Sequence, residues 1–447
     1  MRRKHIAILG AGPAGSAAAL GLLRLGYRVT VISDWRRFNA IEGTSERVLH
    51  ALRTVGLRQA SGTAIAAARR EVYWAGHHSL RNREWLLDRQ VFDRALREDL
   101  RRSGIALLEA RVLTVDVAAD GVCLQLDGAA SLEADFVVDA RGRQAPQSGE
   151  AVRGPETLSL LCRWRGLEGP AASAAESLVS GWCWLARLPG GDQYWQWTFD
   201  ARHPHMPGKA ELPAWCAAQR GTSRLAGEFF TVDPGEAVEL RARSSTCTLA
   251  ANLCDVRSIR VGDAAMAVDP LSGNGIFQSL SSALQAPAVI NTLLQYPADA
   301  ELAQRFHCRR VTELFYRFAR LGRDFYRQAT AVPEQSFWQQ RQQWPDDHPS
   351  HVPVTPEQIV TDWAPVVTGD RVGRARVVIT PDQPLGIWHL NGVELAPVID
   401  ALREASWEQV VGGLPPAQRG PVAGWLQSLG FGPDTAASGA DLHLDQH

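Results

Sequence analysis

The first thirty or so residues alternate between apolar runs and a glycine-rich turn, in the order of a β-α-β unit. The apolar run 6–9 predicts a short buried strand, residues 13–25 an alanine-rich helix, and 28–32 a second strand. Gly10-Ala11-Gly12-Pro13-Ala14-Gly15 joins the first strand to the helix. A Gly-x-Gly-x-x-Gly turn in this setting predicts a dinucleotide site.

Each glycine of this turn has a physical task in such a site. Gly10 permits the tight turn, Gly12 lets a pyrophosphate approach the backbone, and Gly15 lets the helix pack closely on the strand. The free N–H groups at the helix N-terminus then face the phosphates. The alternative is a glycine-rich turn that serves helix packing alone.

The pattern beyond this unit divides the chain. Residues 1–154 and 255–338 carry parallel-strand and helix patterns and form the expected nucleotide-binding domain, with 60–90 contributing in part to a second domain. Residues 155–254 carry short strand-like runs and turns, which predict an antiparallel substrate-binding sheet. Residues 350–433 show helical periodicity and predict a small, mostly helical domain, with a winged-helix arrangement as one form, and 434–447 predict a disordered tail.

Composition limits the function classes. A net charge of −1 over 447 residues gives no general attraction to nucleic acid or to an anionic membrane. The basic start Arg2-Arg3-Lys4 resembles a signal peptide, but glycines and Pro13 break the apolar run that follows, and no run approaches the roughly twenty residues of a membrane span. The seven cysteines form no Cys-x-x-Cys pair. We therefore expect a cytoplasmic protein with reduced thiols and no metal site.

Two further motifs discriminate among dinucleotide-binding proteins. Asp139-Ala140-Arg141-Gly142-Arg143 ends a predicted strand, and Gly262-Asp263-Ala264-Ala265 runs on to Asp269-Pro270-Leu271-Ser272-Gly273-Asn274-Gly275. With the N-terminal turn, they resemble the three fingerprints of the para-hydroxybenzoate-hydroxylase-like flavoproteins. That superfamily includes aromatic hydroxylases, flavin-dependent tryptophan halogenases and geranylgeranyl-reductase-type enzymes. The resemblance implies an α/β fold in which a Rossmann-like FAD-binding domain carries an inserted antiparallel sheet.

The resemblance also implies the residues that hold FAD. Asp263 would accept hydrogen bonds from the ribityl or pyrophosphate side, and the helix that follows Pro270 would point its N-terminus at the isoalloxazine and stabilise the anionic reduced flavin. The family places an acidic residue at the end of the second strand, where this chain has Ser33 followed by Asp34. The full set is Gly10, Gly12, Pro13, Ala14, Gly15, Ser33, Asp34, Arg47, Arg89, Val112, Asp139, Gly142, Gly262, Asp263, Pro270, Gly273, Asn274 and Gly275.

Gly181-Trp182-Cys183-Trp184 resembles the Gly-Trp-x-Trp segment of the halogenase branch. Tryptophans there would line a pocket that excludes water, and the expected pocket residues are Trp182, Trp184, Trp195 and Trp197; the alternative is core packing. Halogenation also requires a lysine beside the substrate, yet the chain has none between Lys4 and Lys209. Arg69 and Arg70 cannot replace it, because a guanidinium stays protonated.

Oxygen transfer remains as the favoured reaction. The resemblance implies an FAD-dependent monooxygenase that hydroxylates an electron-rich aromatic, an indole or a phenol, through a flavin C4a-hydroperoxide. Dioxygen would be the oxidant, with electrons from NAD(P)H or from a separate flavin reductase. His77, His78 and Glu42 are candidate helpers for proton removal, but none is assigned as catalytic.

The substrate stays open between two kinds of aromatic. Halogenase-like flavoproteins of tryptophylquinone biogenesis, which mature quinohemoprotein amine dehydrogenase, hydroxylate a tryptophan within a polypeptide, and this chain resembles them. The alternatives are a small-molecule natural-product hydroxylase, a halogenase, a geranylgeranyl-reductase-like enzyme and a non-enzymatic maturation chaperone. A plain NAD dehydrogenase would leave the Asp139 and Asp263 motifs unexplained.

Overall fold

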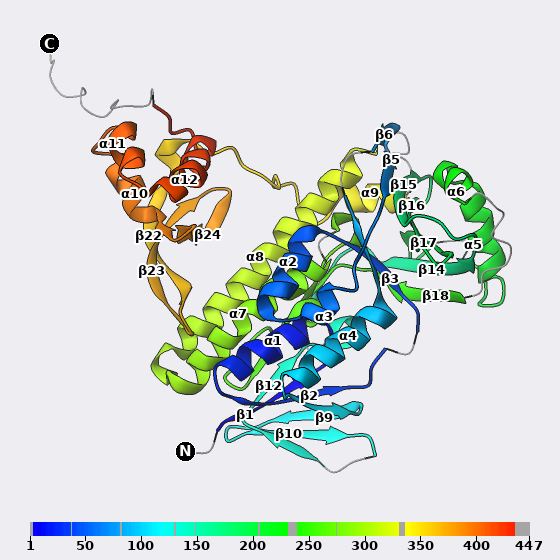
Figure 1. Ribbon diagram of the computed structural model, residues 1–447, viewed down its shortest axis with the longest axis horizontal. Helices are drawn as coiled ribbons and strands as arrows, with labels where there is room; N and C mark the ends of the chain where they lie inside the picture. The colour runs from blue at the N-terminus through cyan, green and yellow to red at the C-terminus, as the bar shows by residue number, and fades with distance from the viewer. Residues whose placement is uncertain are drawn as a thin grey trace.

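The opening β-α-β unit lies at the centre of a five-stranded parallel sheet (Figure 1). The computed structural model describes residues 3–433 except 37, 81–82, 129–130, 148, 204–205, 231–238, 274 and 330–335. The strand order is β20 (Ser258–Arg260), β12 (Phe136–Asp139), β1 (His5–Leu9), β2 (Arg28–Ser33) and β8 (Ala106–Glu109). The predicted Rossmann-like arrangement is confirmed.

Alternate residues of β1 face two different layers, as the period of a strand requires. Ile6 and Ile8 pack into the main core with the helices, whereas Ala7 and Leu9 pack against a three-stranded meander. The helices that contribute to the main core include α1 (Pro13–Arg24), α2 (Glu46–Val55), α4 (Arg89–Arg102) and α7 (Gly275–Gln295). The meander consists of β9 (Val112–Val117), β10 (Val122–Leu126) and β11 (Leu132–Ala134).

A seven-stranded sheet forms the second structural unit, to the right in Figure 1. Its order is β18 (Glu239–Ser244), β14 (Thr157–Arg165), β17 (Asp192–Asp200), β16 (Gly181–Arg187), β15 (Ala172–Leu178), β5 (Arg69–Trp74) and β6 (His77–Ser79). Neighbouring strands are antiparallel except β15 and β5. The inserted antiparallel sheet is therefore confirmed, and β5 and β6 reach it from an earlier part of the chain.

The two faces of this sheet have different covers. One face packs against α5 (Leu212–Gly221) and α6 (Arg224–Phe229). The opposite face packs against a small sheet of β3 (Ile41–Thr44), β7 (Trp85–Asp88) and β4 (Ile65–Ala66), and against α9 (Ser336–Gln343) and the end of α8 (Ala300–Arg327). This second face is turned toward the Rossmann-like unit.

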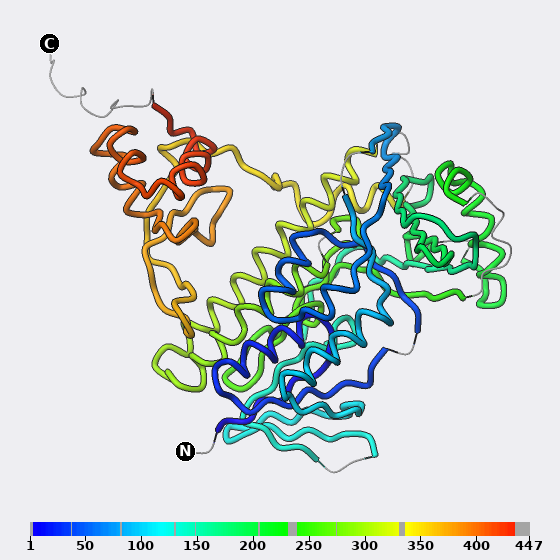
Figure 2. Tube along the Cα trace, in the orientation of Figure 1, coloured from blue at the N-terminus to red at the C-terminus, as the bar shows by residue number. Residues whose placement is uncertain are grey.

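The C-terminal part contains a sheet that the helical pattern did not predict. Three strands, β22 (Val360–Thr368), β23 (Arg371–Thr380) and β24 (Gln383–Ile387), accompany helices α10 (Leu395–Ala401), α11 (Trp407–Gly412) and α12 (Pro416–Ser428). Figures 1 and 2 show that the β22–β23 hairpin runs down to the end of α7, while the helices stand away from the rest of the chain. The predicted disordered tail, 434–447, lies outside the described residues.

The hairpin tip is built into the main core. Val372 is fully buried there, and its N–H donates to Thr292 Oγ1 at 2.8 Å. The amide of Asn291 donates to Asp370 O at 2.9 Å. The C-terminal part is therefore joined to the Rossmann-like unit by packing as well as by the chain. Within the described ranges no helix is long and apolar enough to cross a membrane.

His307 of α8 makes this fold sensitive to acid. Its ring is 2% exposed, with Nε2 at 2.9 Å from Arg260 O, and burial lowers its pKa from 6.5 to about 4. Between these two values the unfolded chain binds a proton that the native chain excludes, so stability falls as the pH falls. We expect a loss of about 1.4 kcal/mol per pH unit in that window.

Urea denaturation midpoints measured from pH 7 to pH 4 test this expectation. His307→Gln keeps an N–H donor for Arg260 O and should flatten the pH dependence. Exposed His50→Gln is the matched control and should not change it. An equally steep profile in His307→Gln would contradict the assignment.

Candidate flavin and substrate site

The three sequence motifs meet at backbone distances too short for a side chain. A Cβ atom at Gly10, whose φ is 98°, would lie 2.5 Å from Ala140 O. A Cβ at Gly15 would lie 2.0 Å from Gly10 O, and one at Gly262 would lie 2.7 Å from the Cβ of Ala14. The β1–α1 turn therefore touches both the end of β12 and the short 3-10 helix Gly262–Ala264.

The N-terminus of α1 is open on its outer side. Its N-cap residue, Gly12, provides no side-chain cap, and Pro13 is the first helical residue. A Cβ at Gly12 would meet nothing within 4 Å. The uncapped N–H groups and the free space above Gly12 suit an anionic pyrophosphate.

The second half of the candidate site surrounds the start of α7. Asp263 accepts a hydrogen bond from Ser279 Oγ at 2.9 Å and lies 3.6 Å from Arg143 Nε. Gly273 adopts a left-handed φ of 62°, and neither it nor Gly275 has a neighbour within 4 Å of an added Cβ. The turn after Pro270 therefore leaves room for a planar group at the helix N-terminus.

Two buried polar atoms beside these turns have no hydrogen-bond partner among the described residues. They are Oε1 of Gln278, one turn into α7, and Oγ1 of Thr44 in β3. The guanidinium of Arg47, just after β3, lies 4.0 Å from the ring centre of Phe277 and so joins the two elements. A buried polar group without a partner costs about 1–3 kcal/mol, which a polar cofactor can relieve.

The other predicted cofactor residues take varied positions. Ser33 ends β2 and its Oγ accepts from the N–H of Trp35, while Asp34 is exposed. Asp139 holds the guanidinium of Arg141 at 2.9 and 2.8 Å. Gly142 has a φ of 65°, Val112 begins β9, and Asn274 lies outside the described residues.

Arg89 is a buried charge with two partners. Its Nη1 donates to Glu42 Oε1 at 2.7 Å and its Nη2 to Asp93 Oδ1 at 2.8 Å. Burial alone would lower the pKa of Arg89, but these two carboxylates raise it above its ordinary value. Burial would likewise raise the pKa of Glu42, yet the positive charge of Arg89, with that of Arg243 and Arg36, lowers it. A carboxylate held ionised by several arginines is a weak base, which argues against Glu42 as the helper.

The two candidate histidines lie at a sheet edge. Both are exposed in β6, the last strand of the seven-stranded sheet. His78 Nε2 lies 2.6 Å from Glu71 Oε1. The structure brings neither ring to the three motifs.

The expectation that four tryptophans line one pocket is wrong, because side chains of a strand alternate between faces. Trp195 and Trp197 are fully buried beneath α5 and α6, in one cluster with Phe199. Trp182 and Trp184 point to the opposite face, where both pack near the end of α8. These two therefore form the wall toward the Rossmann-like unit.

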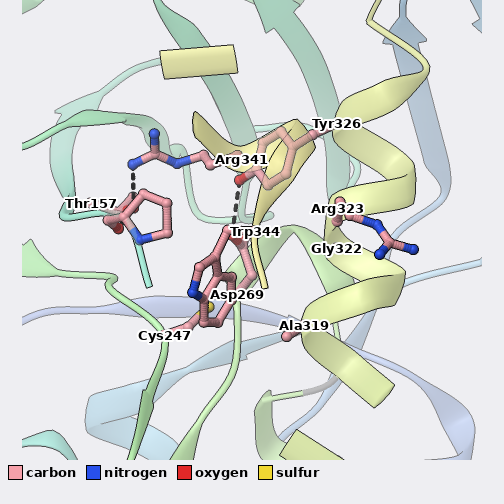
Figure 3. Close-up of a pocket in the computed structure, with 10 residues that line it drawn as sticks. Thr157, Cys247, Asp269, Ala319, Gly322, Arg323, Tyr326, Arg341 and Trp344 are labelled. Carbon is pink, nitrogen blue, oxygen red and sulfur yellow. Dashed lines mark hydrogen bonds between the residues drawn. The ribbon is translucent and has the colours of Figure 1, made fainter. Parts of the chain in front are cut away.

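A buried chain of hydrogen bonds joins this wall to the turn before α7. Trp182 Nε1 donates to Tyr326 OH at 3.3 Å. Tyr326 OH in turn donates to Asp269 Oδ2 at 3.0 Å, and Figure 3 shows this second bond. Burial raises the pKa of Asp269 and, together with the nearby Asp269 charge, that of Tyr326. The sequence offered no signal for Tyr326, which lies near the end of a long amphipathic helix.

Figure 3 shows the residues that line a small cavity beside Tyr326 and Asp269. It measures about 10 Å³ and is lined in part by Asp269, Tyr326, Thr157 and Arg341, whose Nη2 donates to Thr157 Oγ1 at 2.6 Å. Such a volume holds about one water molecule and no aromatic substrate. A second cavity of about 260 Å³, between α8 and the turn before β24, has no lining residue from the three motifs.

The fold and the site together define a flavin-dependent oxidoreductase, with a Rossmann-like cofactor domain and an aromatic wall beside the turn before α7. Comparison with known proteins supports this class of enzyme. A sequence profile of the tryptophan halogenase family matches residues 59–357. The chain belongs to this family.

Three relatives show the range of similarity. The solved structure of the peptidyl tryptophan dihydroxylase QhpG, essential for tryptophylquinone cofactor biogenesis, is 52% identical, with a TM-score of 0.84 over 96% of this chain and 100% of that one. Tryptophan 2-halogenase of Chondromyces crocatus is 23% identical over 75% of this chain and 70% of its own length. The halogenase PltM in complex with phloroglucinol and FAD shares the fold, with 16% identity and a TM-score of 0.60 over 73% of this chain and 77% of that one.

The geometry of the site fits FAD, the cofactor of this family. The open N-terminus of α1 suits its pyrophosphate, and the space around Gly273 and Gly275 suits its ring. Residues at both positions come from the motifs that converge on Gly262.

Gly15→Ala should disturb the turn that is proposed to hold the pyrophosphate of FAD. The new Cβ meets a backbone oxygen at 2.0 Å, so the turn must move. Overpacking of this kind costs about 1–3 kcal/mol, which predicts an FAD dissociation constant raised by about tenfold or more in a fluorescence titration.

Gly227→Ala is the control, because a Cβ in that helix meets nothing within 4 Å. It should bind FAD as the wild type does. Equal affinities for all three proteins would contradict the proposed position of the pyrophosphate.

Proposed function

We propose that this protein is an FAD-dependent monooxygenase that hydroxylates a tryptophan side chain within a polypeptide, as a step of tryptophylquinone biogenesis. The observation that supports this best is the 52% identity to a peptidyl tryptophan dihydroxylase along the full length of that protein. A match of this extent includes the C-terminal part, which lies outside the matched family region.

The chemistry of the wall favours oxygen transfer over halogenation. Halogenation needs an amine close to the substrate, and no lysine occurs between Lys4 and Lys209. When bound and reduced, FAD would supply the two electrons that activate dioxygen, so that one oxygen atom enters the ring and the other leaves as water. Trp182, which is buried, would help to exclude bulk water from that step, and the partly buried Trp184 would hold an aromatic ring by its face.

The residues of the chain would position both partners. The turn from Pro270 to Gly273 would place the ring system at the N-terminus of α7, and Arg47 beside Phe277 would bring positive charge to the same region. The chain from Trp182 through Tyr326 to Asp269 would hold the aromatic wall at a fixed distance from that turn. Electrons would come from NAD(P)H directly or from a separate flavin reductase.

A labelling experiment tests the function. The FAD-loaded protein is incubated with a tryptophan-containing polypeptide, NADH or NADPH, and ¹⁸O-labelled dioxygen, with and without a flavin reductase. We expect the mass of the tryptophan residue to rise by one or two labelled oxygen atoms. The same mixture with bromide present should give no brominated product, and bromination would favour the halogenase alternative.

The two-faced arrangement of the tryptophans gives a second test. Trp184→Phe removes an N–H from the wall and should lower product formation by at least about tenfold, with the lost turnovers appearing as hydrogen peroxide. Trp195→Phe changes the opposite face and should lower stability by about 1–3 kcal/mol while the FAD-loaded protein keeps its activity. Equal loss of hydroxylation in both variants would contradict the assignment of faces.

A further inference from the structure

Glu84 lies where the small sheet meets the aromatic wall. Its Oε2 accepts a hydrogen bond from Trp184 Nε1 at 3.3 Å and lies 3.6 Å from Arg70 Nε. The carboxylate is 13% exposed. A Cβ at Gly43 would lie 2.1 Å from Oε1, so Oε1 rests against the backbone of β3.

Both neighbours of this carboxylate extend toward the proposed flavin position. Trp184 packs against two hydrophobic clusters, one with Leu86 of the small sheet and one that includes Leu271 of the turn before α7. Gly43 lies four residues before Arg47, which contacts Phe277 at the start of α7. Glu84 therefore contacts the aromatic wall through Trp184 and strand β3 through Gly43, and it belongs to none of the three motifs.

The charge of this group suits the proposed reaction. An amine at such a place can carry an electrophilic halogen, whereas a carboxylate can only accept hydrogen bonds or a proton. The carboxylate already accepts a hydrogen bond from the indole N–H of Trp184.

We propose that Glu84 is a catalytic base of this enzyme, and the proposal rests on the hydroxylase function argued above. Once the new C–O bond has formed on the indole ring, the C–H bond at the same carbon breaks. Its electron pair returns to the ring and restores aromaticity, and the proton passes to the carboxylate of Glu84. The step is a proton transfer and needs no oxidant beyond the dioxygen already consumed.

Two substitutions of Glu84 give opposite rankings for a base and for a structural anchor. Glu84→Gln keeps the length and the acceptor for Trp184 but cannot take a proton, whereas Glu84→Asp keeps the carboxylate and shortens the arm. For a base, Glu84→Gln should hydroxylate the tryptophan polypeptide at least about 100-fold more slowly than wild type, and Glu84→Asp should stay the more active of the two. For an anchor, Glu84→Gln would be the near-normal variant.

The matched control is Glu71→Gln. Glu71 is also a buried glutamate paired with an arginine, and its carboxylate lies 2.7 Å from Arg69. In β5 it follows Arg70, the partner of Glu84, and therefore points to the other face of the sheet. It should hydroxylate at the wild-type rate. FAD content and melting temperature are measured for every variant, and we expect Glu84→Gln to match wild type in both, with ring deuteration of the tryptophan slowing its product formation.

The outcomes separate the two proposals. Wild-type protein that forms no hydroxylated tryptophan overturns the proposed function and the role of Glu84 with it. Wild-type activity accompanied by Glu84→Gln within about threefold of it, or more active than Glu84→Asp, overturns the role of Glu84 alone. A slow, FAD-replete and stable Glu84→Gln supports both.

Discussion

The arrangement of the whole molecule depends on the contact of three backbone segments around Gly10, Gly15 and Gly262. At each of these positions a Cβ atom would meet another atom at 2.7 Å or less. Helix α1, the end of strand β12 and the 3-10 helix Gly262–Ala264 can therefore approach only if these residues lack side chains. The contact fixes where both ends of a long dinucleotide would lie, and the antiparallel sheet is placed relative to that axis.

The aromatic wall is held to this frame by buried polar contacts. Tyr326 connects Trp182 to Asp269, and Asp269 also caps the short turn that begins at Pro270. A carboxylate in such surroundings is costly unless it is hydrogen-bonded, so the network tolerates few alternative geometries. Rigidity of this kind suits a reaction in which a ring must stay a fixed distance from its oxidant.

The local patterns predicted the Rossmann-like unit, because glycine spacing and strand periodicity are properties of neighbouring residues. They could not predict which tryptophans share a surface, because the register of β16 with β17 decides that Trp184 lies opposite Gln196 and Trp195 opposite Leu185. They also missed long-range pairs such as Trp184 with Glu84, which are 100 residues apart. The strands of the C-terminal part were not predicted because apolar and polar residues do not alternate regularly along them. In β22 the large apolar residues Val360 and Trp363 are exposed, whereas the small Ala364 is buried.

The burial of Val372 bears on how this protein can be divided or recombined. The sequence patterns place a domain boundary between residues 338 and 350, but a chain cut there would lose Val372 from the apolar core at the end of α7 and its hydrogen bond to Thr292. The apolar surface exposed by that loss invites aggregation. A chimera that exchanges the C-terminal part between relatives must therefore also exchange the end of α7. The hairpin tip and that helix end pack together and have to come from the same parent protein.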